Sequence, residues 1–277
     1  MIRLGEMQTL KITRKVDFGV YLSEEDGTEE VLLPNKYVPE GKRPGDEVEV
    51  FVYRDSQDRL ISTTLTPKLC LGQVARLKVV QVGKIGAFLD WGLEKDLLLP
   101  YRQQKRKVQE GEEVLVSMYI DKSGRLCATM NVHRELSKES PYQKDDKVTG
   151  TVYEISDNFG AFVAVDDLYS ALIPKKELFG RELTVGETVE ARVIRVKEDG
   201  KLDLSIRQKA YLQMDEDGEK VLALIDSFGG GLPFNDKAAP EVIRRETGMS
   251  KNEFKRAVGH LLKEKKITLT EKGIHRA

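Results

Sequence analysis

The residues of this chain that could do chemistry are aromatic side chains beside a glycine, in a short segment that occurs three times. Residues 18–21 read FGVY, residues 85–88 read IGAF and residues 159–162 read FGAF. Aromatic faces can stack on unpaired nucleic-acid bases, and each stack contributes about 1–3 kcal/mol. We therefore expect two stacking rings in the first and third segments and one in the second. The candidate rings are Phe18, Tyr21, Phe88, Phe159 and Phe162.

A bend at the glycine decides whether both rings of a segment reach the same surface. Residues three apart on a regular strand point to opposite faces of the sheet. Glycine permits the bend that would bring Phe159 and Phe162 together at Gly160, and Gly19 and Gly86 occupy the same place in the other segments. The alternative interpretation is that one or both rings pack in a hydrophobic core.

Further features follow each aromatic segment at matching distances. An apolar run ending in proline comes next, and a Gly-acid pair with a valine comes after it, as at Pro174 and Gly186. Because the repeat has a fixed period, each copy should be one folding unit. We place the units at residues 1–66, 67–138 and 142–210, followed by a tail at residues 213–277.

Alternating apolar and polar residues in the third copy predict five short strands. These are residues 148–155, 159–165, 171–173, 188–196 and 202–206. Hairpins this short are unstable alone, so the strands must close on one another. The pattern predicts a small Greek-key barrel, the oligonucleotide-binding fold, and hence a mainly β chain with three tandem five-stranded barrels.

The tail predicts three helices and a hairpin. Residues 219–228 place apolar side chains on one helical stripe, Asp236 can cap a second helix that Gly248 closes, and Ser250 begins a capping box for a third. A hairpin at residues 267–274 would complete a small α+β winged helix-turn-helix domain.

The third helix of the tail carries Lys251, Lys255 and Arg256. A recognition helix in a DNA groove would look like this, and so would the wet side of an ordinary amphipathic helix. Two hypotheses follow from the tail. The chain is a regulator that binds duplex DNA through this helix, or it is a scaffold whose tail docks on a protein.

Charge is uneven along a chain whose formal net charge is only −1. Residues 2–64 hold 9 basic and 13 acidic side chains, whereas residues 68–136 hold 12 and 8. The basic excess includes the run from Arg102 to Lys107. Affinity for phosphate depends on such a local patch and not on the average charge.

Composition excludes several other classes of function. No run of about 18 apolar residues could span a membrane, and the N-terminus lacks an apolar signal core, so we expect a cytoplasmic protein with no membrane partner. Cys70 and Cys127 are expected to be small buried residues. Three scattered histidines, with no nucleotide-binding loop or hydrolase motif, predict no metal, no cofactor, no small-molecule substrate and no catalytic residue. We therefore expect that the chain is not an enzyme.

The third copy resembles the S1 RNA-binding domain through Gly150, residues 159–163, Gly186 and residues 202–207. The second copy matches well, and the first is more distant because residues 23–30 form an acidic insertion. The resemblance implies single-stranded RNA as the partner. It also implies RNA contacts by an Asp and an Arg that straddle the last hairpin, or by the residues in their place. These are Asp55 and Arg59, Asp121 and Arg125, and Lys197 and Lys201.

Two departures from the S1 pattern bear on the expected contacts. The two lysines of the third copy keep the attraction for phosphate but lose the forked donor geometry of arginine. The histidine that the family can carry in its third strand is replaced by Pro34, Pro100 and Pro174. The resemblance therefore implies that one hydrogen bond to the nucleotide is missing in all three copies.

Three such barrels followed by a winged helix resemble the conserved virulence factor B family of bacterial RNA-binding regulators, in order and in total length. The resemblance implies a cytoplasmic, non-enzymatic, post-transcriptional regulator. Three weak RNA sites in series would raise the overall affinity through effective concentration.

Overall fold

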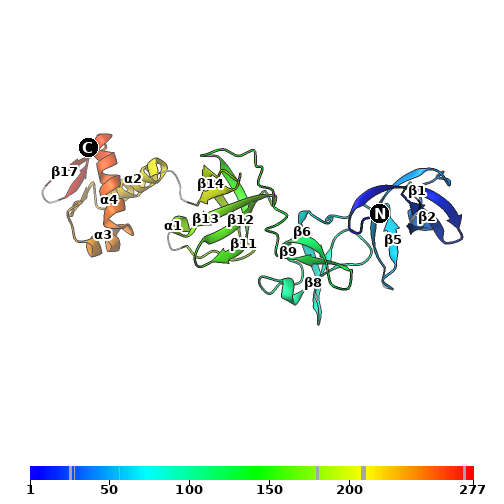
Figure 1. Cartoon of the computed structure of the whole chain (residues 1–277). Helices are drawn as coiled ribbons and strands as arrows, with labels where there is room; N and C mark the ends of the chain where they lie inside the picture. Colours follow the sequence, from blue (N-terminus) through cyan, green and yellow to red (C-terminus); the bar gives the residue numbers. More distant parts are fainter. Residues whose placement is uncertain (25–26, 28, 56, 179–180, 207–209, 271–272) are drawn as a thin grey trace. The chain divides into compact units, whose positions relative to one another are not determined.

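The computed structural model describes residues 1–24, 27, 29–55, 57–178, 181–206, 210–270 and 273–277, except for the side chains of residues 210–216. The chain divides into two compact units, Met1–Ile206 and Arg207–Ala277. In its described part, the first unit holds three five-stranded sheets, and the second holds three helices with a small sheet (Figure 1).

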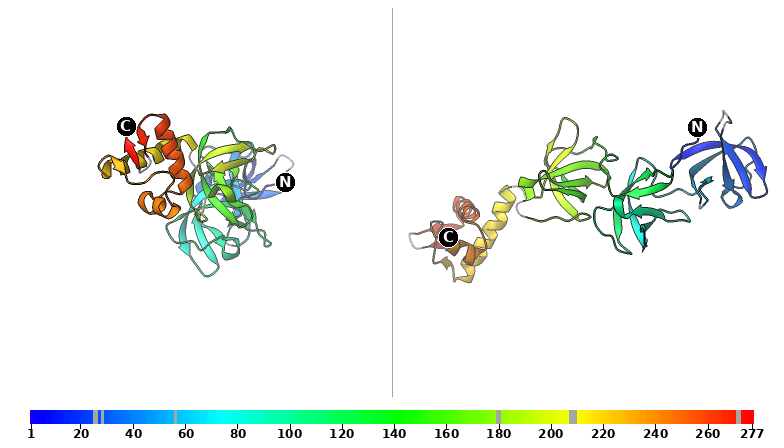
Figure 2. Two further views of the ribbon diagram at one scale, coloured as in Figure 1. Left: turned by 90° about the vertical axis from the view of Figure 1, so that its left-hand side faces the viewer. Right: turned by 60° about the horizontal axis from the view of Figure 1, so that its bottom comes forward.

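The third sheet is a closed barrel with the strand order β11-β12-β13-β15-β14, and its curvature is visible in Figures 1 and 2. Its elements are β11 (Lys147–Ser156), β12 (Gly160–Val165), β13 (Tyr169–Pro174), α1 (Lys175–Leu178), β14 (Thr188–Val196) and β15 (Leu202–Ser205). Neighbouring strands are antiparallel except β13 and β15, whose parallel pairing closes the barrel. The five predicted strands are confirmed. Arg207, the last residue of the S1-like pattern, lies outside the described residues.

The first sheet is a closed barrel of the same topology, β1-β2-β3-β5-β4. Its strands are β1 (Met7–Val16), β2 (Gly19–Ser23), β3 (Glu30–Pro34), β4 (Glu47–Arg54) and β5 (Leu60–Thr63). Three positions of the acidic insertion, residues 25, 26 and 28, lie outside the described residues, as does residue 56 in the last hairpin.

The second sheet has the order β10-β9-β6-β7-β8 and is open between β8 and β10. Its strands are β6 (Val74–Val82), β7 (Gly86–Asp90), β8 (Leu97–Pro100), β9 (Glu113–Ile120) and β10 (Leu126–Thr129). β8 has four residues, against five in β3 and six in β13, so less backbone is left for a parallel ladder. Gln103 bridges the open edge, because its carbonyl accepts the Met130 N–H at 2.9 Å and its side-chain oxygen accepts the Thr129 hydroxyl at 2.7 Å.

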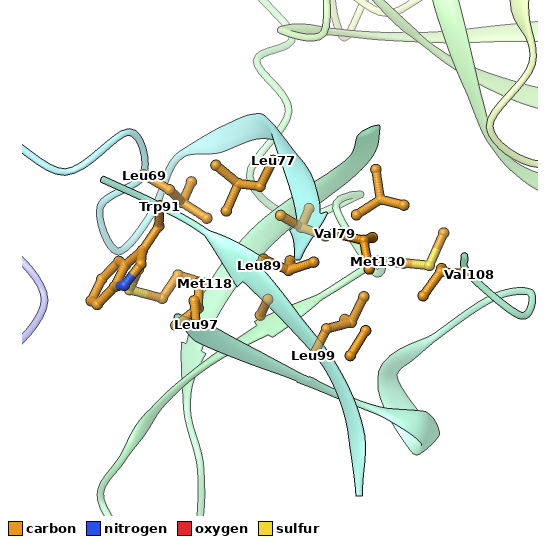
Figure 3. Packing of buried hydrophobic residues seen from close by; sticks show 14 of the residues in the cluster. Leu69, Leu77, Val79, Leu89, Trp91, Leu97, Leu99, Val108, Met118 and Met130 are labelled. Atoms are coloured by element: carbon orange, nitrogen blue, oxygen red, sulfur yellow. The ribbon is translucent and has the colours of Figure 1, made fainter. Parts of the chain in front are cut away.

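The strand alternation places one face of each strand in the interior of its own sheet. In the second sheet, Leu77 and Val79 of β6 are buried, while Lys78 between them is exposed. Figure 3 shows the side chains of Leu77, Val79, Leu89 and Leu99 gathered in this interior. The predicted mainly β fold with three five-stranded barrel-like sheets is therefore confirmed.

Successive sheets of the first unit contact each other through packed side chains. Phe51 of β4 meets Trp91, which follows β7, with ring centroids 5.6 Å apart and planes at 81°. Arg76 of β6 forms an ion pair at 2.5 Å with Asp167, which follows β12 in the third barrel. Both contacts hold neighbouring barrels against one another.

The second unit consists of helices packed on a small sheet of order β16-β18-β17 (Figure 2). Its elements are α2 (Ala210–Ser227), β16 (Gly231–Leu232), α3 (Pro240–Thr247), α4 (Lys251–Lys263), β17 (Ile267–Leu269) and β18 (Ile274–Arg276). The capping box is confirmed, because Ser250 N–H donates to Glu253 and Glu253 N–H donates to the Ser250 hydroxyl. Gly248 ends α3 with φ +70°, as expected. Residues 271 and 272 of the predicted hairpin lie outside the described residues.

The predicted cap at Asp236 is wrong. The helix α3 begins at Pro240, and Ala239 occupies the cap position with no side-chain hydrogen bond. Proline has its φ angle fixed near the helical value and lacks an N–H, so it suits a first helical position that has no side-chain cap. Asp236 lies in the turn before the helix, where Asn235 accepts the Lys237 N–H at 3.0 Å.

No described helix is both long enough and apolar enough to cross a membrane. Within the same residues, no group of three or more His, Cys, Asp or Glu side chains is arranged to hold a metal ion. Cys127 is buried, which raises the pKa of its thiol to about 11, and Cys70 is half-buried.

Candidate nucleic-acid interface

Gly160 begins β12 at a point where β13 passes close by. A Cβ added to Gly160 would overlap the Ile173 carbonyl oxygen and lie 2.7 Å from the Lys175 nitrogen. The backbone has φ +117° there, which residues with a Cβ rarely adopt. Glycine therefore lets the chain bend, and Phe159 and Phe162 on either side of it lie with ring centroids 6.4 Å apart.

A cavity of about 200 Å³ opens beside these two rings. Phe159 is 63% exposed, while Phe162 is partly buried. Lys197 and Lys201, on the hairpin between β14 and β15, also line the cavity. The four residues predicted for the third barrel are therefore gathered around one space. The other lining residues are His133, Ser170, Ala171, Leu172 and Leu202.

The two lysines of the cavity each have an acidic neighbour. The Lys197 Nζ lies 2.9 Å from Asp203, and the Lys201 Nζ lies 3.0 Å from Asp199. The hydrogen bond from Lys201 holds the pKa of the Asp199 carboxyl below its usual range. The Asp199 carboxylate is exposed, and exposed ion pairs contribute little to stability, so a phosphate oxygen can compete for the Lys201 ammonium group. The Asp203 carboxylate that pairs with Lys197 is largely buried.

His133 is a lining residue that the sequence did not indicate. It belongs to the segment between β10 and β11, outside the repeated pattern. Its Nδ1 lies 3.1 Å from the Tyr153 hydroxyl, and its ring lies edge-on to Phe162 at 6.4 Å. Burial raises the pKa of Tyr153 to about 12, so this hydroxyl keeps its proton. No periodic signal could have placed His133 here, because the other copies have no counterpart to it.

The first barrel presents its two rings differently. Phe18 is 58% exposed. The Arg14 guanidinium carbon, however, lies 3.8 Å from the centroid of the Tyr21 ring, and Glu30 holds Arg14 through an ion pair of 2.9 Å. The hydrogen bond from Arg14 lowers the pKa of the Glu30 carboxyl. One face of Tyr21 is therefore already covered by a cation.

The second barrel offers a ring that the aromatic segment does not contain. Ile85 is 61% exposed and Phe88 is partly buried, while Tyr101, directly after β8, is 47% exposed. The Tyr101 N–H donates to the Ile85 carbonyl at 3.4 Å, and its hydroxyl donates to the Gly83 carbonyl at 2.6 Å. Tyr101 therefore lies next to the position where an aromatic residue is missing. The only signal in the sequence was its place after Pro100.

The Asp and Arg residues of the last hairpins are engaged within the protein. Arg59 donates twice to Asp55 of its own hairpin, at 2.9 and 2.7 Å. Arg125 instead donates to both carboxylate oxygens of Asp58 in the first barrel, at 2.6 and 2.7 Å, and lowers the pKa of that carboxyl. Asp121 accepts backbone N–H groups of its own turn. RNA contacts by these residues remain a prediction.

The basic residues of the tail lie on α4. Lys255 and Arg256 are exposed and, with Asn252, line a surface hollow of about 570 Å³, while Lys251 is partly buried at the start of the helix. All three lining residues come from one helix, so the hollow has no opposing wall among the described residues. A role for Lys251, Lys255 and Arg256 in binding also remains a prediction.

Comparison with known domain families identifies each part of the chain. Residues 4–65 and 71–131 match the family model of an S1 domain, and residues 142–207 match that of the S1 RNA binding domain. Residues 219–275 match a CvfB-like winged helix domain, which confirms the predicted winged helix. These are nucleic-acid-binding domains, so the chain is built to bind nucleic acid.

Curated relatives match this chain over most of its length. The uncharacterized protein YitL of Bacillus subtilis is 35% identical over 96% of this chain and 91% of its own. Conserved virulence factor B of Staphylococcus epidermidis is 32% identical over 83% of this chain and 82% of its own. A crystal structure of a multidomain protein with nucleic acid binding domains from Streptococcus pneumoniae is 24% identical, with 99% and 98% of the two chains covered and a TM-score of 0.49. On the identity and coverage of these curated relatives, the chain belongs to the conserved virulence factor B family.

Proposed function

We propose that this chain binds single-stranded RNA without catalysing a reaction, and that the cavity of the third barrel is its principal site. The observation that carries the proposal is the gathering of Phe159, Phe162, Lys197 and Lys201 around one cavity. Rings that stack on bases and cations that follow the phosphates are the two components of a single-strand site.

The shape of the cavity favours unpaired bases. Its volume of about 200 Å³ is below the roughly 300–1,000 Å³ of typical small-molecule pockets. In a duplex the base faces are covered by neighbouring base pairs, so an exposed ring such as Phe159 gains a stacking partner only from a strand whose bases are splayed apart.

The first two barrels would add weaker sites in series. Phe18 and Tyr101 are exposed, but Arg14 covers one face of Tyr21, and Arg125 is held by Asp58. Linked weak sites raise the overall affinity when one strand can reach two of them.

A direct titration tests the proposal. Fluorescence anisotropy of a labelled single-stranded RNA is followed with the full chain and with the Phe159→Ala variant. Loss of one stack should weaken binding by about 5- to 150-fold, which corresponds to about 1–3 kcal/mol. Phe228→Ala, which removes an exposed ring from the second unit, is the matched control and should leave affinity unchanged.

Two outcomes would contradict the proposal. Equal RNA affinity of the Phe159→Ala variant and the wild type would show that Phe159 does not stack on a base. Shortening of the labelled RNA during incubation would show a nuclease and overturn the non-enzymatic assignment. Salt gives a second measure, because the logarithm of the affinity should fall by about 0.7 per phosphate neutralised for each unit of log salt concentration.

The regulatory part of the proposal, post-transcriptional control in the cytoplasm, is supported by the family resemblance. Crosslinking of the protein to RNA in growing cells, followed by sequencing, tests it. Recovery of a defined set of transcripts whose abundance or translation changes when the gene is deleted is the expected result.

A second candidate function is duplex nucleic-acid binding through α4, favoured by the exposed Lys255 and Arg256 beside Asn252. Full-length protein with Lys255→Ala and Arg256→Ala would then lose affinity for duplex DNA but not for single-stranded RNA. Lys263→Ala, an exposed lysine at the other end of α4, is the control. If duplex affinity is absent in the wild type, or unchanged in the double variant, α4 is not a duplex-binding surface.

A further inference from the structure

The segment that joins the second and third barrels is fixed in place by apolar packing. Val132 and Leu136 are buried in one cluster with Leu115 of β9, Tyr153 of β11 and Ala164 of β12. This cluster draws residues from both barrels. His133 lies on the turn between the buried residues Val132 and Leu136, so its position is set by the packing of the segment and not by the repeat.

The same segment then runs along the third barrel. The Ser137 N–H donates to the Leu168 carbonyl, and the Ser170 N–H donates to the Ser137 carbonyl, both at 2.9 Å. Farther on, the Lys138 carbonyl lies so close to Gly200 that a Cβ there would overlap it. Because Gly200 lies in the hairpin that carries the two cavity lysines, the segment contacts both this hairpin and β13, and each of them supplies residues that line the cavity.

The polar atoms of His133 suit a base edge. Tyr153 keeps its proton, so its hydroxyl can donate to Nδ1, and in the tautomer that accepts this bond the ring proton is on Nε2. Among the described residues, Nε2 of His133 has no hydrogen-bond partner. His133 lines the cavity beside Phe162, and its Nε2 is therefore available as a donor.

We propose that His133 is a specificity-determining residue of the third barrel: Nε2 donates a hydrogen bond to an acceptor on the edge of the base that stacks at Phe159 and Phe162. This inference rests on the proposed function. Stacking accepts any base, because every base has a π face, whereas a donor at a fixed place selects bases that present an acceptor there. The segment between the barrels thus makes the third site composite, and the isolated barrel would lack the selecting group.

The test compares base preference in the full chain. Affinities for short labelled oligouridine, oligocytidine and oligoadenosine RNA are measured for the wild type, His133→Phe and His133→Gln. The phenyl ring keeps the packing without the donor, and the glutamine amide keeps a donor. We expect His133→Phe to reduce the ratio between the best and worst oligomers by about 2- to 12-fold, the worth of one hydrogen bond, and His133→Gln to retain most of it. His275→Phe, an exposed histidine of the second unit, is the control.

Each other outcome overturns the inference. A wild type without base preference, an unchanged ratio in His133→Phe, or an equal loss in the phenylalanine and glutamine variants excludes a hydrogen bond from His133. The proposed function is tested separately by Phe159→Ala. If this variant loses affinity for all three oligomers, the stacking site stands even where the inference about His133 fails.

Discussion

The first and third barrels have the same strand order and differ in the residues that surround their aromatic rings. In both, a glycine begins the second strand where the third strand passes too close for a Cβ, and an exposed phenylalanine precedes that glycine. In the third barrel, the rings adjoin a cavity shared with Lys197 and Lys201. In the first barrel, Arg14 lies over Tyr21 and is held there by Glu30.

Placement of the rings and access of a base to them are two separate requirements of a binding site. The glycine and the strand order decide where the rings are placed. Neighbouring charges decide whether a ring face is available to a base and whether a phosphate is attracted. A base that stacks on the covered face of Tyr21 must displace a cation, whereas in the third barrel it meets the exposed ring of Phe159 and two ammonium groups. We therefore expect equal roles for the motif in folding and unequal roles in binding.

The largest effect should come from removing the rings of one barrel at a time. Phe159→Ala with Phe162→Ala removes two stacks and should weaken RNA binding by about 30-fold or more, since each stack is worth about 1–3 kcal/mol. Phe18→Ala with Tyr21→Ala should weaken it by less than about threefold, because Tyr21 is already covered. Anisotropy titration with one labelled RNA measures both. Equal losses would abolish the distinction between the barrels.

The glycines should behave alike in folding. Gly160→Ala and Gly19→Ala each force a Cβ against a backbone carbonyl and should each lower the free energy of unfolding by about 2–4 kcal/mol. Gly160 adds the strain of φ +117°. Gly111→Ala, with φ +87° but open space around its Cβ, is the control for backbone strain alone and should cost less. Scanning calorimetry measures the loss. RNA affinity should fall only with Gly160→Ala, so a similar fall with Gly19→Ala would show that the first barrel binds as strongly as the third.

Much of this architecture was predictable because it repeats or is local. The five strands of the third copy follow from alternation, the bend follows from Gly160, and the start of α4 follows from the Ser250 capping box, each of which depends on residues close together in the chain. Among the residues around the third cavity, Phe159 and Phe162 follow from the repeat, whereas Lys197 and Lys201 follow from the resemblance to the S1 domain. The cap at Asp236 failed because Pro240 imposed a later start on the helix.

The remaining features depend on residues from different copies or from different strands of one copy, which no period encodes. His133 reaches the third cavity because Val132 and Leu136 pack between two barrels. Arg125 was expected beside RNA, yet its guanidinium meets Asp58, which is 67 residues away in the sequence. Arg14 covers Tyr21 because Glu30, from a different strand, holds it there. Such contacts determine which rings and cations are already engaged within the protein, and they become visible only in the folded chain.

Tyr101 offers the second barrel an aromatic ring outside the repeated segment. If its exposed ring replaces the aromatic residue missing at Ile85, Tyr101→Ala should weaken RNA binding by about fivefold, the lower end for one stack, because its hydroxyl also holds it to Gly83. Tyr101→Phe keeps the ring, loses only that hydrogen bond, and should bind like the wild type. Anisotropy titration distinguishes the two variants. Weaker RNA binding by both variants would show that Tyr101 acts through its hydrogen bond in the fold of the second barrel and not by stacking on a base.

The smallest expected effect is a gain in the first barrel. Glu30→Gln removes the carboxylate that holds Arg14 over Tyr21, so the ring face and the guanidinium both become available to RNA. The change is made with Phe159→Ala and Phe162→Ala, so that the first barrel is measured without the third, and affinity should rise by about twofold. Glu49→Gln removes the same charge from an exposed position on β4 and is the control.

The gain in affinity from Glu30→Gln should depend on pH. Arg14 lowers the pKa of Glu30, so the ion pair is complete above that pKa and is lost as the pH falls through it. The advantage of Glu30→Gln over its parent should therefore be full at neutral pH and vanish in acid, where the parent also releases Arg14. If the advantage is the same at every pH, it comes from something other than release of Arg14. If Glu49→Gln gives an equal gain, the acidity of the whole barrel limits binding, and the cover over Tyr21 does not.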